Sequence, residues 1–292
     1  MKKIGMLVAV LSLLLPTLVA AQDKVLKMST TTSTQSSGLL DVLLPEFKKD
    51  TGIEVKVMAK GTGAAIRDGM DGNVDVIFVH DPAREEKFVA DGYGTKRYYV
   101  MFNDFLLIGP ASDPAGAKGK DAAVAMKKIA RSEAVFVSRG DDSGTHAKEQ
   151  ELWKDSGLEL KEEDAVFKAK NKEVTFKAVH PAAMKGFMSI GQGMGKTLVF
   201  AEEKQGYTIT DRGTYVQYKY GRQEGLDLEP ICEGDKRLFN PYGVIPVNPA
   251  KFSHVRFDLA DAFAKWLVSE RGQAVIANYK LLGQQLFFPD AK

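Results

Sequence analysis

A run of hydroxyl residues near the N-terminus has the composition of an anion-binding turn. Ser29 to Thr34 and Ser36 all carry hydroxyls, and they directly precede an apolar helical pattern that begins at Leu39. One Ser or Thr suffices to cap a helix, so a run of them needs a further reason. Hydroxyls beside the exposed amides of a helix N-terminus form a set of donors for a negative group. The alternative is a polar loop with one capping residue.

A second turn, from Arg139 to Thr145, adds a positive charge to the same chemistry. The Arg139 guanidinium offers a fork of hydrogen-bond donors to an oxyanion. Ser143 and Thr145 add hydroxyls, and Gly144 lets backbone N–H groups approach a ligand closely. We expect Asp141 to hold the guanidinium by an ion pair. The alternative is a capped helix with an ion pair on the surface.

Two glycine-rich segments carry weaker signals. Lys60-Gly61-Thr62-Gly63 is a third turn with glycine and hydroxyl groups before a helical pattern. Gly191–Gly195 resembles a phosphate loop but has Ile190 where that pattern needs its first glycine. Its role stays open between a helix entry near the ligand and a turn without ligand contact.

A hydrolytic enzyme is the main hypothesis of another class. Ser143 would be its nucleophile and His146 its base. The two residues lie on one helical turn, which gives poor geometry, and no third residue is evident to orient the histidine. His146, just past Thr145, is expected to face solvent on the first helical turn; the alternative is that it supports the ligand-binding residues from behind. The histidines as a set show no metal-ligand spacing: His80, His146, His180 and His254.

Alternating strands and helices must position these turns. Strand patterns at 25–29, 53–57 and 74–79 are separated by helical patterns at 39–50 and 64–70. This order predicts a parallel sheet with helices on its faces. Further strands are expected at 105–108, 135–137 and 242–247, and an apolar helical stripe at 259–279.

The N-terminus predicts export. Residues 1–21 combine Lys2 and Lys3 with an apolar run and end in small residues, which is typical of a signal peptide cleaved after Ala21. The run is too short to span a bilayer. A bacterial periplasm fits best.

Composition excludes several other classes of protein. With 44% apolar and 27% charged residues, the 292-residue chain is typical of one or two globular domains. Without Lys2 and Lys3, the 40 basic residues fall to the number of acidic residues, 38. A neutral chain has no overall field for nucleic acid or anionic membranes. The single cysteine, Cys232, excludes an intramolecular disulfide.

The sequence resembles the TupA family, the tungstate-binding periplasmic proteins of ABC importers. The most specific matches are Thr30–Thr34 followed by Ser37–Leu40, and the segment Ser138–His146. Weaker matches extend the resemblance over nearly the whole chain after the leader; they are 72–76, 79–80, 92–94, 103–105, 191–195 and 210–215.

The resemblance implies a type II-like periplasmic binding protein fold. Two α/β lobes, each a mostly parallel sheet flanked by helices, would be joined by strands crossing near 105–108 and 242–247. Lobe I would hold residues 22–104 and 246–292, and lobe II residues 105–245. The lobes would close on a ligand in the cleft. The implied ligand-binding residues are Thr32, Ser33, Thr34, Thr62 and Gly63 in lobe I, and Arg139, Ser143, Gly144 and Thr145 in lobe II.

The resemblance also implies a binding protein and no enzyme, with tungstate or molybdate as ligand. A fully ionised tetrahedral dianion accepts hydrogen bonds and donates none, which suits a site of donors. Tungsten would be bound as its oxyanion, without protein metal ligands and without a cofactor. The implied partner of the monomer is an inner-membrane ABC permease. A sensor module feeding a membrane receptor would use the same site.

Phosphate is the rival ligand, because the Arg139 turn also resembles that of periplasmic phosphate-binding proteins. Phosphate keeps a proton near neutral pH, so a selective site needs an acceptor. Asp81, after the strand at 74–79, is the candidate, and its charge would repel tungstate. The alternative is that Asp81 caps a helix with Pro82 at its first position.

Overall fold

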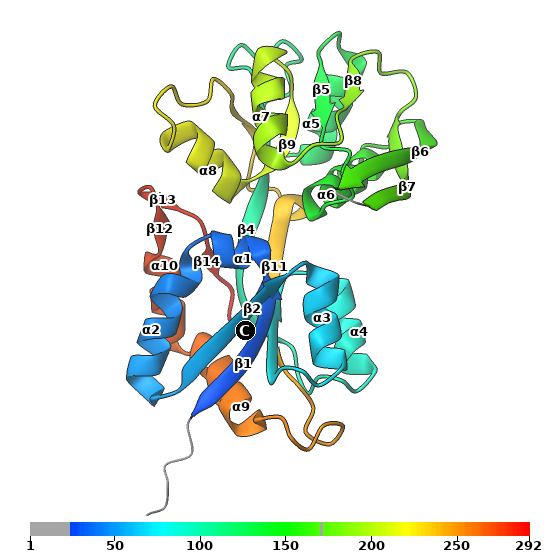
Figure 1. The fold of residues 1–292 in the computed structure, drawn as a ribbon. Helices are drawn as coiled ribbons and strands as arrows, with labels where there is room; N and C mark the ends of the chain where they lie inside the picture. Colours follow the sequence, from blue (N-terminus) through cyan, green and yellow to red (C-terminus); the bar gives the residue numbers. More distant parts are fainter. Residues whose placement is uncertain (1–23, 170–171) are drawn as a thin grey trace, which may run out of the picture.

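Two lobes joined by two long strands make up the molecule (Figure 1). The computed structural model describes residues 24–169 and 172–292, so the predicted signal peptide at 1–21 lies outside the described residues. The joining strands are β4 (Tyr98–Gly109) and β11 (Phe239–Pro246). No helix in the described part of the chain is long and apolar enough to cross a membrane. The predicted two-lobed α/β architecture is confirmed.

The sheet of lobe I is parallel at its centre and antiparallel at one side. β1 (Val25–Thr31) lies between β2 (Glu54–Lys60) and β3 (Val76–Val79), and both pairings are parallel. β11 pairs antiparallel with β3 and with the first part of β4, and the C-terminal β14 (Phe288–Pro289) pairs antiparallel with β4. The sheet is therefore more mixed than expected, because the joining strands and the C-terminus enter it in the opposite direction.

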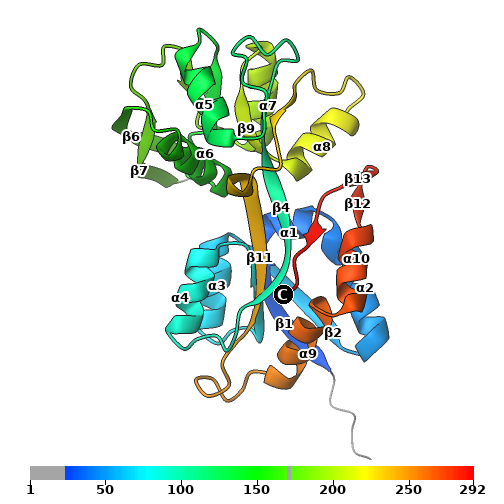
Figure 2. The same ribbon diagram turned by 180° about the vertical axis from the view of Figure 1, so that it is seen from behind.

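Helices cover both faces of this sheet (Figures 1 and 2). On one face Phe47 meets Phe263 and Trp266 edge to face, with ring centroids 4.9 and 5.4 Å apart. Segments from both ends of the chain thus share one core. The helices of lobe I are α1 (Thr32–Ser36), α2 (Leu39–Thr51), α3 (Thr62–Met70), α4 (Pro82–Ala90), α9 (Phe257–Leu267) and α10 (Glu270–Asn278), and a two-stranded ribbon of β12 (Lys280–Leu281) and β13 (Gln284–Gln285) follows α10.

Lobe II contains both antiparallel and parallel strand pairs, so it is also more mixed than the mostly parallel sheet that was expected. β4 pairs antiparallel with β9 and β10, whereas β5 and β8 are parallel. The hairpin of β6 and β7 has no counterpart among the elements expected from the sequence. The strands of lobe II are β5 (Phe136–Ser138), β6 (Leu160–Ala169), β7 (Lys172–Pro181), β8 (Phe187–Ser189), β9 (Thr208–Asp211) and β10 (Glu229–Cys232). Its helices are α5 (Ala122–Arg131), α6 (Gly144–Asp155), α7 (Met194–Glu203), α8 (Arg212–Tyr220) and the 3-10 turn η1 (Lys236–Leu238).

Strand β4 changes partners where it passes from one lobe to the other. Asp104 is paired with Phe239 of β11, and the next residue, Phe105, is paired with Asp211 of β9. β11 pairs with β4 from its first residue, Phe239, and with β3 from Gly243. The predicted division of the chain after residues 104 and 245 stays a prediction, and this pairing favours an earlier return to lobe I, near Phe239.

A carboxyl group is buried in lobe II. Glu149 on α6 is 2% exposed, and Trp153 Nε1 donates to its Oε1 at 3.1 Å. Burial raises the pKa of Glu149 to about 7, against the opposing effect of the hydrogen bond from Trp153. The folded protein therefore favours the uncharged acid below about pH 7.

Phe263→Ala is expected to lower the free energy of unfolding by about 3–5 kcal/mol, because it leaves a cavity among buried rings. Val42→Ala is the control, since Val42 is 44% exposed on α2, and its effect should stay within about 0.5 kcal/mol. Urea denaturation followed by circular dichroism measures both. Equal effects of the two variants would contradict a shared core of α2 and α9.

Glu149→Gln is expected to gain stability relative to the unchanged protein as the pH rises from 5 to 8. In the unfolded chain Glu149 ionises above its ordinary pKa of 4.5, whereas in the folded protein it stays protonated up to about pH 7. The unchanged protein therefore loses free energy of unfolding as the pH rises from about 4.5 to about 7, and the Gln variant does not. The gain is at most about 3 kcal/mol. Guanidinium denaturation at both pH values measures it, with the exposed Glu151→Gln as control. A pH-independent difference would mean that Glu149 titrates normally.

Candidate functional site

The three parallel strands of lobe I end at one edge of the sheet, and the predicted turns of this lobe begin there. β1 and β2 are in register at Thr31 and Lys60, and Thr30 lies opposite Phe78 of β3. The chain then enters α1, α3 and α4 respectively. Figure 1 shows α1 and the start of α3 on the side of lobe I that faces lobe II. Carboxyl ends of strands in open α/β sheets are where ligands usually bind.

The hydroxyl run divides into buried and exposed members. Thr31 caps α1, because its Oγ1 accepts the Thr34 N–H at 3.1 Å and lies 2.6 Å from Thr34 Oγ1. Thr34 is fully buried, whereas Thr32 and Ser33 are exposed. Thr32 and Ser33 are thus available to a ligand. The position of Thr34 favours holding the turn over touching a ligand directly.

The turn at Thr62 and Gly63 opens α3. Gly61 occupies the N-cap position without a side-chain hydrogen bond. The first amides of a helix have no partners within it, so those of α3 can serve an anion. Lys60, just before this turn, pairs with the largely buried Asp68 at 2.7 Å.

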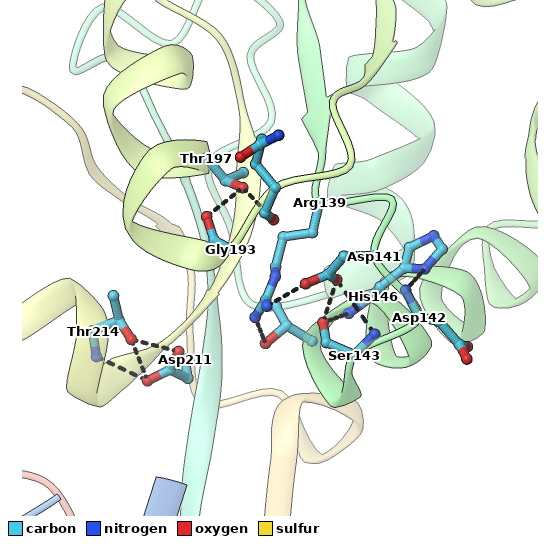
Figure 3. Close-up of polar contacts among 11 residues, drawn as sticks. Arg139, Asp141, Asp142, Ser143, His146, Gly193, Thr197, Asp211 and Thr214 are labelled. Carbon is cyan, nitrogen blue, oxygen red and sulfur yellow. Dashed lines mark hydrogen bonds and ion pairs between the residues drawn. The ribbon is translucent and has the colours of Figure 1, made fainter. Parts of the chain in front are cut away.

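In lobe II, Arg139 is held by Asp141, as predicted (Figure 3). One terminal nitrogen of Arg139 contacts the Asp141 carboxylate, and the other donates to Thr145 Oγ1 at 3.3 Å. Asp141 also accepts the Ser143 hydroxyl at 2.6 Å. The Arg139 Nε is buried and has no hydrogen-bond partner within residues 24–169 and 172–292. Together with Gly144, these residues form one cluster at the start of α6.

Backbone conformation explains why this turn has its sequence. Gly140 has φ +58°, and a Cβ there would lie 2.0 Å from Ser189 Oγ. Only glycine fits that close approach of β8. Asp142 has φ +54°, a left-handed conformation that is rare without glycine and that often occurs at functional sites.

The loop at Gly191–Gly195 lies beside Arg139. β5 and β8 are parallel and in register at Ser138 and Ser189, so the segments that follow them emerge together. The Gln192 N–H donates to the Arg139 carbonyl at 3.1 Å. Figure 3 shows Gly193 and Thr197 next to Arg139. Gly193 starts α7 without a side-chain cap, so this loop is a helix entry beside Arg139.

His146 does not face solvent, so that expectation is wrong. It is 3% exposed, and its ring meets Phe176 of β7 edge to face at 5.4 Å. The unpredicted hairpin β6–β7 covers it. Its Nδ1 accepts the Asp142 N–H at 3.3 Å, and burial lowers its pKa. Because Ser143 donates to Asp141, the nucleophile and base of the hydrolase hypothesis do not form a pair.

Asp81 caps α4, which is the alternative to its role as a phosphate acceptor. Its Oδ1 accepts the Arg84 N–H at 3.1 Å, and its carboxylate pairs with the Arg84 side chain at 3.3 Å. Pro82 occupies the first turn of the helix.

Arg212 is a second arginine near the point where β4 passes between the lobes. It is not among the ligand-binding residues expected from the sequence. It pairs with Asp104 of β4 at 2.5 Å and with Glu233 at 2.8 Å. Its neighbour Asp211 caps α8 by accepting the Thr214 N–H at 2.8 Å. The pattern Asp211-Arg212-Gly213-Thr214 is typical of a helix start after a strand. This pattern could have indicated from the sequence that Arg212 lies at the end of a strand.

Comparisons with known proteins show the family of the chain. The family model described as PBP superfamily domain matches residues 18–271. The tungstate-binding protein TupA of Peptoclostridium acidaminophilum is 47% identical over 269 residues, which cover 90% of this chain and 85% of that protein.

Two solved structures are similar over nearly the whole chain. The tungstate-binding protein TupA of Desulfovibrio alaskensis G20 is 47% identical with a TM-score of 0.81, covering 92% of this chain and 99% of that one. The tungstate ABC transporter structure from Geobacter sulfurreducens is 46% identical with a TM-score of 0.66, covering 88% and 99%. The chain therefore belongs to the PBP superfamily and, within it, to the family of the TupA proteins.

Proposed function

We propose that this protein binds tungstate between its lobes and delivers it to the permease of an ABC importer, with molybdate as the closest competitor. The observation that carries the proposal is that both lobes end their parallel strands in turns of hydrogen-bond donors. Lobe I offers Thr32, Ser33 and the start of α3, and lobe II offers the Arg139 cluster and the start of α7. The named ligand of relatives at 46–47% identity supports tungstate.

The chemistry of the site suits a dianion that only accepts hydrogen bonds. Asp141 offsets much of the Arg139 charge, so neutral dipoles must provide the remaining stabilisation. Closure of the lobes lowers the local dielectric and strengthens each contact. Nanomolar affinity corresponds to about 12 kcal/mol. Six or more charge-assisted hydrogen bonds of about 1.5–3 kcal/mol each are sufficient.

The protein acts as a monomeric receptor in the periplasm, without catalysis. The Ser143 hydroxyl donates to Asp141 and, among residues 24–169 and 172–292, accepts only the backbone N–H of His146, which supports this proposal. A hydrolase would need that hydroxyl hydrogen-bonded to the ring of its base. The predicted leader at residues 1–21 supports export. The alternative ligand, phosphate, loses its proposed acceptor because the Asp81 carboxylate is engaged at the start of α4.

Arg139→Ala is expected to weaken tungstate binding by at least about 100-fold, because it removes charge-assisted bonds to the oxyanion. Calorimetric titration of the protein with tungstate, molybdate, sulfate and phosphate measures this and the selectivity. Arg131→Ala, at the exposed end of α5, is the control and should bind like the unchanged protein. Tight binding of phosphate, or of no oxyanion, would refute the proposed ligand.

Asp81→Asn is expected to leave the affinities for tungstate and phosphate within about threefold of their original values, since Asn also caps helices well. The same titrations measure them. If Asp81 accepted a phosphate proton in the site, the variant would instead lose phosphate binding or gain tungstate affinity.

A further inference from the structure

His80 connects the turn that holds Thr31 and Ser33, called here the hydroxyl turn, to the joining strand β11. Its Nε2 lies 3.1 Å from Thr31 Oγ1 and 3.2 Å from Ser33 Oγ. Its Nδ1 lies 3.1 Å from Asn240 Oδ1 on β11. The ring also stacks on Tyr242 of β11, with centroids 4.7 Å apart. These contacts fix both the plane and the rotation of the imidazole.

A chain of amides favours a proton on Nδ1 of His80. Asn240 Nδ2 donates to Asn103 Oδ1 at 2.7 Å, and Asn103 Nδ2 donates to Tyr242 Oη at 3.3 Å. The Asn240 Oδ1 is then an acceptor, so His80 Nδ1 must be the donor. In a neutral imidazole this leaves Nε2 as an acceptor.

The neutral ring is favoured by its surroundings. Burial lowers the pKa of His80 and outweighs the opposing effects of the hydrogen bond to Asn240 and of the negative charges of Asp81 and Asp211. Nε2 has one lone pair and accepts one hydroxyl proton. Two hydroxyls, from Thr31 and Ser33, lie within reach of it.

Burial decides between these two hydroxyls. Thr31 is 3% exposed, and its Oγ1 accepts the Thr34 N–H and lies 2.6 Å from the hydroxyl of the fully buried Thr34. With the Thr34 hydroxyl as the donor of that contact, both lone pairs of Thr31 Oγ1 are occupied, and the proton of Thr31 itself needs another partner inside the protein. Nε2 of His80 provides that partner. Ser33 is exposed, and its proton is then taken up neither by the ring nor by Thr31 Oγ1, which lies 3.0 Å away but already accepts two hydrogen bonds. An oxyanion accepts hydrogen bonds only, so Ser33 can bind it only as a donor.

We propose that His80 is a positioning residue of the anion site: Asn240 holds its Nδ1–H, its bare Nε2 accepts the Thr31 proton, and the Ser33 hydroxyl is thereby left to donate to the bound oxyanion. The proposal rests on the proposed function for its ligand. It also ties the turn that contacts the ligand to β11, one of the two strands between the lobes.

The tautomer is the first test, and it needs no ligand. Long-range ¹H–¹⁵N spectra of the protein labelled with ¹⁵N-histidine distinguish the two tautomers and the imidazolium. The signal of His80 is assigned by its loss in His80→Gln. We expect Nδ1 protonated and Nε2 bare at pH 7.5, with and without tungstate. A proton on Nε2 would overturn the proposal.

Affinity is the second test, by calorimetric titration with tungstate. His80→Phe keeps the ring but loses the acceptor and should bind about tenfold more weakly, the effect of about one hydrogen bond. His80→Gln restores an acceptor and should stay within about threefold. His180→Phe is the matched control, since His180 stacks on Phe187 at 4.8 Å in the same way but, within residues 24–169 and 172–292, has no contact with Thr31 or Ser33.

The outcomes separate the two proposals. If the unchanged protein binds tungstate and His80→Phe binds equally well, the role of His80 is refuted and the function stands. If the unchanged protein binds no tungstate, the proposed function is refuted, and the spectra still decide the tautomer. Should His80→Phe fail to fold, a loss of affinity in His80→Gln far beyond threefold would count against the proposal.

Discussion

The ion pair between Arg139 and Asp141 is the interaction on which the site depends. It removes most of the formal charge from the turn while fixing the direction of the guanidinium. An arginine without an ion pair would attract any anion, and its side chain would move toward the nearest carboxylate. A neutralised one adds aimed donors, so that affinity must come from the number and placement of dipoles. In the site proposed above, the dipoles come from the start of α6, the start of α7 and the hydroxyl turn of α1.

The placement of these dipoles follows from strand direction. In both lobes, neighbouring parallel strands deliver their carboxyl ends to one edge, and each strand is followed by a helix whose first amides point back to that edge. β4 and β11 then turn the two edges toward each other (Figure 1). The antiparallel pairing of β11 with lobe I and of β4 with β9 and β10 anchors each joining strand in a sheet.

Local patterns predicted β1 to β3 with α2 and α3 in lobe I, whereas β8 and α7, on either side of Gly191–Gly195, were not expected. The period of Leu39 to Phe47, the cap at Asp81 and the pair Arg139–Asp141 all involve neighbours within a few residues. Contacts between distant segments were beyond such patterns. His80 and Asn240 are 160 residues apart, and the hairpin that buries His146 is visible only once β7 is folded over α6. The role of Gly191–Gly195 likewise depended on the register of β5 and β8.

The discontinuity of lobe I sets an order of assembly. Phe47 near one end of the chain packs on Phe263 near the other, so the core of this lobe is completed only when α9 and α10 are available. Lobe II is formed by a continuous stretch between β4 and β11 and has no such requirement. A chain that is synthesised or exported with its N-terminus first can therefore fold lobe II, with the Arg139 cluster of the proposed site, before lobe I is complete. The hydroxyl half, with α1 seated on a finished sheet, comes last.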